Sequence, residues 1–181
     1  MLMQTHEARL AALRDELKRR ELDGFVVPLC DEHMSEYVGA YAQRLEWLTG
    51  FGGSAGSAIV LTSKEGGNGA AIFTDGRYTL QVREQVDGKL WDYVGVPATS
   101  PADWLARYVK AGQRIGFDPW LHAHGQAQQL KKAVEKKGAT LVAVADNPID
   151  AVWQDRPEPS AAAAVPHPDD LAGKASSAKR E

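Results

Sequence analysis

The sequence predicts an α/β domain built on a mixed β-sheet of about five to six strands flanked by helices. One observation is that short apolar runs alternate with longer stretches whose apolar residues recur at helical spacing. The other is a pair of apolar runs, 57–62 and 69–74, separated only by the Gly-rich segment 63–68. That arrangement favours a β-hairpin, so the sheet contains at least one antiparallel pair.

The chain begins with an amphipathic helix followed by a buried strand. Residues 6–22 place Leu10, Leu13 and Leu17 on one face of the helix, with charged side chains on the other. The apolar run 25–27 then has the composition of a buried strand, and the proline after it ends the strand.

Helices and single strands alternate along the rest of the chain. Ser100 followed by Pro101 marks a helix start, because serine accepts a bond from a free backbone N–H and proline has no N–H to leave unpaired. Gly138 ends another helix, whose last turn is rich in lysine. The expected elements are helical turns at 43–48, a helix at 76–86, a strand at 90–94, a helix from 101, a strand at 114–117, a helix at 124–137, a strand at 139–144 and a short helix at 147–153.

Composition changes towards the C-terminus and predicts the domain organisation. Residues 1–154 carry the alternating pattern of one domain, and 155–168 form a linker rich in proline and alanine. Residues 169–181 then begin a helix that has no further partner in the sequence. We expect a second domain to follow this helix, and the alternative is a disordered tail.

Composition also limits the location and the partners of the protein. The formal net charge of −3 gives no electrostatic attraction to nucleic acid. Cys30 is the only cysteine, so the chain cannot form an internal disulfide. The N-terminal segment lacks the apolar core of a secretory signal, and no apolar run approaches the ~18 residues of a membrane span. We therefore expect a cytoplasmic protein with no nucleic-acid or membrane partner.

The stretch 31–78 holds most of the residues that suggest a function. Its glycine cluster, 50–56, contains the pattern G-x-S-x-G around Ser54, which in serine hydrolases presents the nucleophile between a strand and a helix. A strand is expected after the cluster here, so a structural glycine turn is the favoured interpretation.

A metal site is another hypothesis for the polar residues of this stretch. If Asp31, His33, Glu36 and Asp75 converge in the fold, their carboxylate and imidazole groups suit a divalent ion. The alternative is that they are surface residues or make structural hydrogen bonds. Zinc-finger spacing is excluded by the single cysteine, and His122–Ala123–His124 lacks the spacing and the glutamate of a zincin helix.

Asp75 and Arg77 lie where the strand 69–74 meets the next helix. An aspartate in that position caps the helix by accepting hydrogen bonds from backbone N–H groups. Arg77 is then near the carboxyl end of a strand, where α/β sheets bind ligands, and its guanidinium recognises carboxylate or carbonyl oxygens. The alternative for Arg77 is an ordinary salt bridge to Asp31 or Glu36.

The order and spacing of several motifs resemble a known family. The motifs are Asp31-x-His33-x-Ser35-Glu36-Tyr37, Arg44, Gly50-Phe51-x-Gly53-Ser54-Ala55-Gly56-x-Ala58 and Thr74-Asp75-Gly76-Arg77-Tyr78-x-x-Gln81. They resemble the creatinase-like N-terminal domain of Xaa-Pro aminopeptidases (aminopeptidase P), in particular the long, cytosolic, three-domain form. The resemblance continues through 103–105, 116–119, 147–153 and 155–157, so it covers nearly the whole chain.

This resemblance implies a ribonuclease-H-like fold and a place in a pita-bread metallopeptidase. Such enzymes remove an N-terminal residue that precedes proline, using two divalent metal ions, usually manganese, in a C-terminal catalytic domain. None of the ligands of those ions can be assigned in this chain. The resemblance further implies that 169–181 is the truncated start of a second, similar domain and that the protein is a homo-oligomer.

The resemblance therefore implies a non-catalytic domain, with no catalytic residue, metal ligand or cofactor in residues 1–181. The implied roles are to shape substrate access and to help subunits associate. Arg77 is implied to contact the bound peptide, whose second residue is proline, while His33 and Glu36 hold that part of the substrate-binding site in place. The glycine cluster 50–56 is implied to be scaffold.

Two other functions remain open at this level. One is a stand-alone or pseudo-enzyme module of the same kind, which binds a partner or small ligand without peptidase activity. The other is an independent serine hydrolase acting through Ser54.

Overall fold

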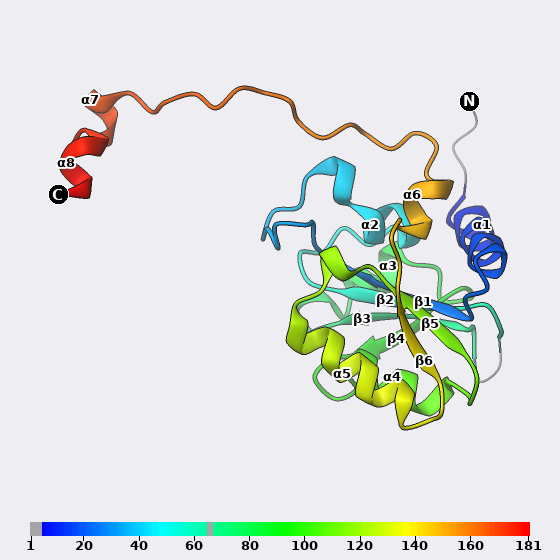
Figure 1. The fold of residues 1–181 in the computed structure, drawn as a ribbon. Coiled ribbons are helices and arrows are strands. Elements are labelled where there is room, and N and C mark those ends of the chain that lie inside the picture. The colour runs from blue at the N-terminus through cyan, green and yellow to red at the C-terminus, as the bar shows by residue number, and fades with distance from the viewer. Residues whose placement is uncertain (1–4, 65–66) are drawn as a thin grey trace.

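The computed structural model describes residues 5–64 and 67–181. The first residues of the N-terminal segment, 1–4, and part of the expected hairpin connection, 65–66, lie outside the described residues. The rest forms a β-sheet with helices on both faces and an extended C-terminal segment (Figure 1).

The sheet has six strands in the order β4-β3-β2-β1-β5-β6. β2 pairs antiparallel with β1 and β3, and every other neighbouring pair is parallel. The expected mixed α/β sheet is confirmed. The strands are β1 (Gly24–Pro28), β2 (Ser57–Leu61), β3 (Ala70–Thr74), β4 (Asp92–Gly95), β5 (Arg114–Phe117) and β6 (Thr140–Ala143).

The strand directions bring the functional residues to one edge of the sheet. All strands except β2 point the same way, so their carboxyl ends meet at the edge where β2 begins. The chain leaves β1 towards β2 on one side and later continues from β5 to β6 on the other side. The point between β1 and β5 is therefore the topological switch point, where α/β sheets usually bind ligands.

Side chains alternate between the two faces of the sheet along its central strands. Phe25 and Val27 of β1 lie in one core layer, whereas Val26 lies in the layer on the opposite face. Ile72 and Phe73 of β3 divide between the layers in the same way. Because both faces are buried, these strands are continuous apolar runs in the sequence.

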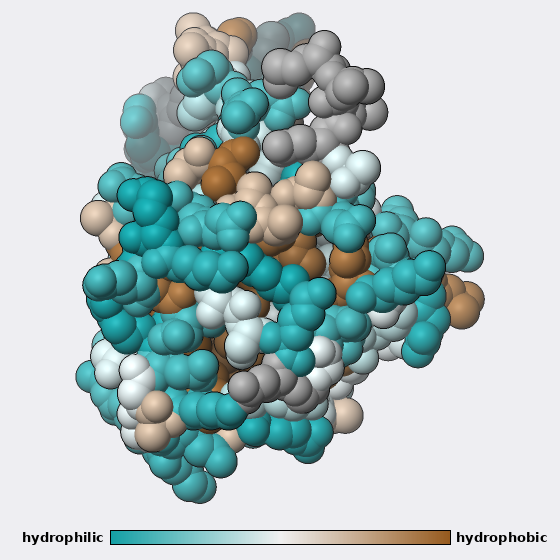
Figure 2. Space-filling view, turned by 90° about the vertical axis from the view of Figure 1, so that its right-hand side faces the viewer, coloured by the Kyte–Doolittle hydropathy of each residue, from teal (hydrophilic) through white to brown (hydrophobic). Residues whose placement is uncertain are grey.

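Helices cover both core layers. In Figure 1, α1, α2 and α6 lie above the sheet and α4 and α5 lie below it. The side of the domain that carries α1 is covered mainly by hydrophilic side chains (Figure 2). The helices of the domain are α1 (His6–Arg19), α2 (Arg44–Thr49), α3 (Gln81–Gln85), α4 (Pro101–Tyr108), α5 (His124–Glu135) and α6 (Pro148–Val152), with 3₁₀ turns η1 (Ala40–Ala42), η2 (Gly76–Tyr78) and η3 (Pro119–Leu121).

Two predicted helices differ from the structure. α1 ends at Arg19 instead of residue 22, because Glu21 adopts a left-handed conformation with φ 56° and the Leu22 N–H bonds back to the Leu17 carbonyl. The predicted helix 76–86 is divided into η2 and α3. Its first turn is tightened by the Asp75 side chain, which accepts the Arg77 N–H.

The other expected elements are present with bounds shifted by a few residues. The largest differences are two residues. β4 begins at Asp92 instead of residue 90, because the Leu90 and Trp91 N–H groups bond to the Asp87 carbonyl in a turn, and α5 ends at Glu135 instead of residue 137. At the start of α4, Ser100 and Asp103 form the expected cap, in which each side chain accepts a bond from the other residue's N–H.

The C-terminal segment extends away from the domain (Figure 1). Its expected helix is present as two short helices, α7 (Asp169–Ala172) and α8 (Ser176–Arg180), interrupted where Gly173 has φ 73°. Residues 157–181 include no buried side chain. Within the described ranges, none of the helices has both the length and the apolar character needed to cross a membrane.

A partly buried ion-pair network joins α2 to α6. The Arg44 side chain is only 7% exposed, and its Nε and Nη2 donate to the two carboxylate oxygens of Asp150 at 2.7 and 2.8 Å. Arg156 adds a contact from Nη1 to Asp150 at 2.7 Å and donates from Nε to the Tyr41 carbonyl. The network therefore connects the segment that follows β1 to the C-terminal end of the domain.

Asp150→Asn should lower the free energy of unfolding of the 181-residue chain by about 3–5 kcal/mol, because it leaves the buried Arg44 charge without its carboxylate. Urea denaturation followed by far-UV circular dichroism measures the change. The matched control is Asp155→Asn, at an exposed position a few residues along the chain, for which we expect less than about 0.5 kcal/mol. Equal effects of the two variants would contradict the role of the network.

Candidate functional site

Three strands are each followed by an aspartate that holds the next loop. Asp31 after β1 accepts the N–H groups of His33 and Ser35, and Asp75 after β3 accepts that of Arg77. Asp118 after β5 accepts the Trp120 N–H. These side chains thus organise the loops at the carboxyl edge of the sheet.

Asp75 and Arg77 form an exposed ion pair at this edge. The Arg77 Nε donates to Asp75 Oδ1 at 3.0 Å and its Nη2 to Oδ2 at 2.8 Å. These bonds, followed by the bond from the Arg77 N–H, lower the pKa of Asp75 to about 2. The expected cap at Asp75 is confirmed. The alternative of a salt bridge from Arg77 to Asp31 or Glu36 is wrong, because the guanidinium pairs with the Asp75 carboxylate.

Tyr78 connects this ion pair to the glycine cluster. Its hydroxyl lies 2.6 Å from the Ser54 hydroxyl and accepts the Ser54 N–H at 3.2 Å. The Arg77 guanidinium lies over the Tyr78 ring at 5.1 Å, and the Phe51 ring meets the same ring edge-on at 5.5 Å. The bond with Ser54 lowers the pKa of Tyr78. Sequence reasoning missed this contact because the two residues lie on separate loops.

The glycine cluster makes these contacts possible. Gly50 has φ 83° after α2, a left-handed conformation that glycine adopts without strain. A Cβ on Gly53 would lie 2.3 Å from the Phe51 ring, so a larger residue would displace that ring. The cluster leads into β2 and not into a helix, and Ser54 bonds to a tyrosine and not to a histidine. The nucleophile-elbow hypothesis is therefore wrong.

His33 and Glu36 lie on the exposed loop that follows β1. The His33 ring contacts Glu32, with Nε2 3.8 Å from Oε1. Between these two residues and Arg77 the described part of the chain shows neither a hydrogen bond nor an ion pair. The structure thus brings all three to the same edge of the sheet without joining them.

The hypothetical metal ligands do not converge. Asp31 is buried, which opposes its ionisation, but bonds from Ser35 and from the His33 N–H outweigh burial and lower the pKa of Asp31. Asp75 is engaged by Arg77. Residues 5–64 and 67–181 contain no group of three or more His, Cys, Asp and Glu residues able to hold a metal ion. The metal hypothesis for these residues is therefore wrong.

Sequence comparison shows the family. Residues 9–152 match the model of the creatinase/prolidase N-terminal domain. The chain belongs to the creatinase/prolidase N-terminal domain family. This membership confirms the resemblance on which the sequence-based expectations rest.

Relatives of this creatinase/prolidase N-terminal domain are much longer proteins. A probable Xaa-Pro aminopeptidase P of Aspergillus flavus is 38% identical over 172 residues, which cover 92% of this chain and 25% of the relative. Xaa-Pro aminopeptidase 2 of Rattus norvegicus is 35% identical over 150 residues, which cover 82% of this chain and 22% of the relative. The chain spans about a quarter of the length of the curated relatives it matches.

A solved structure supports the same relationship. The X-prolyl aminopeptidase of Caenorhabditis elegans, described as a cytosolic enzyme with a di-nuclear active site, superposes with a TM-score of 0.77. The two sequences are 31% identical, and the match covers 86% of this chain and 26% of that enzyme. The fold of this creatinase/prolidase N-terminal domain is thus the one expected from the sequence.

Arg77→Ala should raise the pKa of Asp75 from about 2 towards its ordinary value, because the guanidinium is the first cause of the lowered pKa. The pKa of Asp75 is lower in the folded chain than in the unfolded chain. The ion pair therefore stabilises the fold at pH values above the ordinary aspartate pKa, and this stabilisation is lost as the pH falls towards 2. A carbon-13 NMR titration of the carboxyl group measures the change. Arg83→Ala, at an exposed position on α3, is the matched control. If the pKa of Asp75 is unchanged in Arg77→Ala, the backbone N–H of residue 77 and not the guanidinium lowers that pKa.

Proposed function

We propose that this chain is the non-catalytic N-terminal domain of a metal-dependent Xaa-Pro aminopeptidase, which removes an N-terminal residue that precedes proline. The observation that carries the proposal is the alignment of nearly the whole chain with relatives of that name, of which it spans only about a quarter. In this proposal residues 1–154 are the domain, 155–168 the linker and 169–181 the start of a second, similar domain.

Catalysis is assigned to a part of the enzyme outside residues 1–181. The carboxylates of Asp31 and Asp75 are engaged by N–H groups and by a guanidinium, so this chain does not fit a pair of metal ions. The di-nuclear active site of the C. elegans relative supports two divalent ions in the longer enzyme, and we propose manganese. The cytosolic location of that relative supports a cytoplasmic enzyme.

Arg77 is the residue that we assign to the peptide. Its side chain is 64% exposed at the carboxyl edge, and Asp75 orients it through Nε and Nη2. Within the described ranges Nη1 has no partner, which leaves one side of the planar fork free to donate to a peptide carbonyl or carboxylate. In this proposal His33 and Glu36, on the loop after β1, hold this part of the substrate-binding region in place.

The same edge supports a role in access and subunit association. Exposed apolar side chains follow β1, β3 and β5, and contact with another part of the protein would remove them from water. They are Met34, Tyr37, Leu80 and Trp120. In this proposal they contact the rest of the enzyme and a second subunit of a homo-oligomer, so that the domain narrows the path to the active site.

Arg77→Ala in the full-length enzyme should reduce the turnover of Xaa-Pro peptides by about tenfold to a hundredfold, the usual effect of losing a charge-assisted hydrogen bond. Steady-state kinetics measures the loss, and unchanged metal content and circular dichroism show that the fold is intact. Arg83→Ala should leave the kinetics unchanged. Wild-type kinetics in Arg77→Ala would remove Arg77 from the substrate-binding site.

The natural gene product should have an intact mass several times 19.7 kDa under denaturing conditions, because the relatives are about four times as long as this chain. Native mass spectrometry of the same sample should show a multiple of that mass if the enzyme is a homo-oligomer. A denatured mass near 19.7 kDa would instead favour a stand-alone binding module.

A further inference from the structure

Two adjoining cavities form one groove on the α4 side of the carboxyl edge. The first has a volume of about 200 Å³ and is lined by the end of β1, the start of β2, the first turn of α4 and the first two turns of α5. The second, of about 230 Å³, extends to Phe73 and Asp75 at the end of β3. Ser57 and Pro101 line both cavities, so the two lie next to each other. We call this surface the α4 groove.

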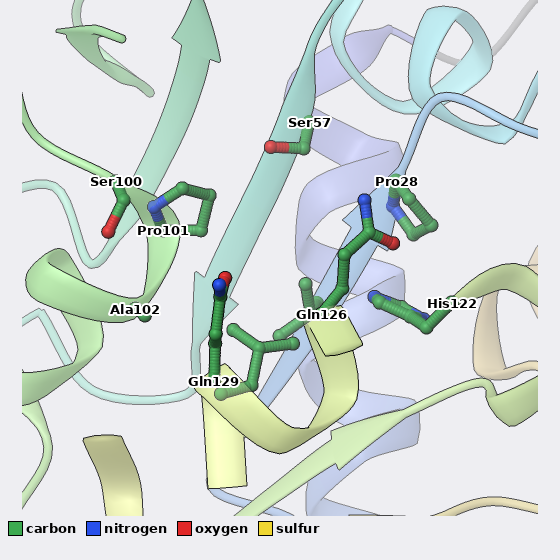
Figure 3. A pocket seen from close by; sticks show the side chains of 10 residues that line it. Pro28, Ser57, Ser100, Pro101, Ala102, His122, Gln126 and Gln129 are labelled. Carbon is green, nitrogen blue, oxygen red and sulfur yellow. The ribbon is translucent and has the colours of Figure 1, made fainter. Parts of the chain in front are cut away.

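The α4 groove lies at the topological switch point of the sheet. Pro28 ends β1 and His122 follows β5, and both line the first cavity. Figure 3 shows side chains from α4, from α5 and from the ends of β1 and β2 around a common opening. An opening at this point is the usual ligand-binding position of an open α/β sheet.

The first cavity is lined by uncharged groups. Its apolar surface comes from Val26, Leu130 and Ala102, and the described residues around it include no Asp, Glu, Lys or Arg. His122 Nδ1 lies 2.8 Å from the Asp118 carbonyl, so Nδ1 carries the proton and Nε2 is left as an acceptor. Burial lowers the pKa of His122, which keeps the ring neutral. The cavity therefore suits an apolar group beside a neutral hydrogen-bonding group.

The other end of the α4 groove reaches the ion pair that we assign to the peptide. Asp75 lines the second cavity, and its charge is compensated by Arg77. β3 and β1 are separated by β2, so the α4 groove spans two strand spacings, roughly 10 Å. That span matches about three residues of an extended peptide, which rise ~3.3 Å each.

We propose that the α4 groove binds an extended, uncharged segment of a peptide, about three residues long, with an apolar side chain in the cavity beside Leu130. The choice of a peptide as ligand rests on the proposed function. The groove would then set a preference for uncharged residues in the part of the peptide that lies beyond its contact with Arg77.

The test uses the 181-residue chain and the probe peptide N-acetyl-Ala-Leu-Ala-amide. Proton–nitrogen NMR titration should give saturable shifts of the amides of Ser57, Ala102 and Gln129. Gln129→Trp, at an exposed position lining the cavity, should weaken binding about tenfold or more by filling the opening. Gln128→Trp is the matched control, since Gln128 is exposed on the same helix and does not line the cavity, and it should bind like the wild type.

Several outcomes would overturn the proposal. These are the absence of shifts around the α4 groove, equal binding in Gln129→Trp and wild type, and equal binding of N-acetyl-Ala-Asp-Ala-amide. In the full-length enzyme, Gln129→Trp should raise KM for peptides that extend several residues past proline and leave KM for the shortest substrates unchanged.

The two proposals fail separately. NMR binding without any peptidase activity of the longer protein would refute the proposed function and keep the α4 groove as a peptide site. An effect of Arg77→Ala on turnover, together with no NMR binding of the probe peptide, would refute the α4 groove as a peptide site and keep the proposed function.

Discussion

The antiparallel pairing of β2 with both of its neighbours determines where the functional surface lies. The register places Ser57 beside Pro28 on one side and beside Phe73 on the other. The chain therefore enters β2 at the edge where β1 and β3 leave the sheet. Without this reversal, the glycine cluster before β2 would lie at the opposite edge, far from Arg77.

The same constraint explains how separate loops cooperate. Ser54 reaches Tyr78 because the glycine cluster and the turn after β3 meet at this edge, and Ser57 lines both cavities because it begins β2 between two strand ends. The Arg44–Asp150 ion pair makes this region rigid by joining α2 to α6 on one face of the sheet. The proposed role in guiding a substrate needs such fixed geometry, since contacts displaced by about 1 Å lose most of their effect.

Aspartates at the strand ends show how the fold uses charge. The sequence left open whether the acidic groups and a histidine converge or make structural hydrogen bonds. In the structure, the carboxylates of Asp31 and Asp118 accept backbone N–H groups, and that of Asp75 also holds Arg77. Satisfying the N–H groups of a loop stabilises it by about 1 kcal/mol per bond and leaves no free carboxylate set for a metal. Among the described residues, Arg77 Nη1 has no partner at this edge, and a guanidinium is suited to recognition and not to hydrolysis.

The sequence by itself determined the local structure and the family. The hairpin strands, the cap at Ser100, the helix ended by Gly138 and the cap at Asp75 all follow from residues close together in the chain, and the spacing of the motifs identified the creatinase-like domain. Tertiary structure alone decided the division of the helix 76–86, the partner of Arg77, the Ser54–Tyr78 contact and the α4 groove. These features depend on strand order and register, which bring loops together that are distant in sequence. The contact of Arg77, His33 and Glu36 with a peptide stays a prediction, and so do the domain bounds beyond 154.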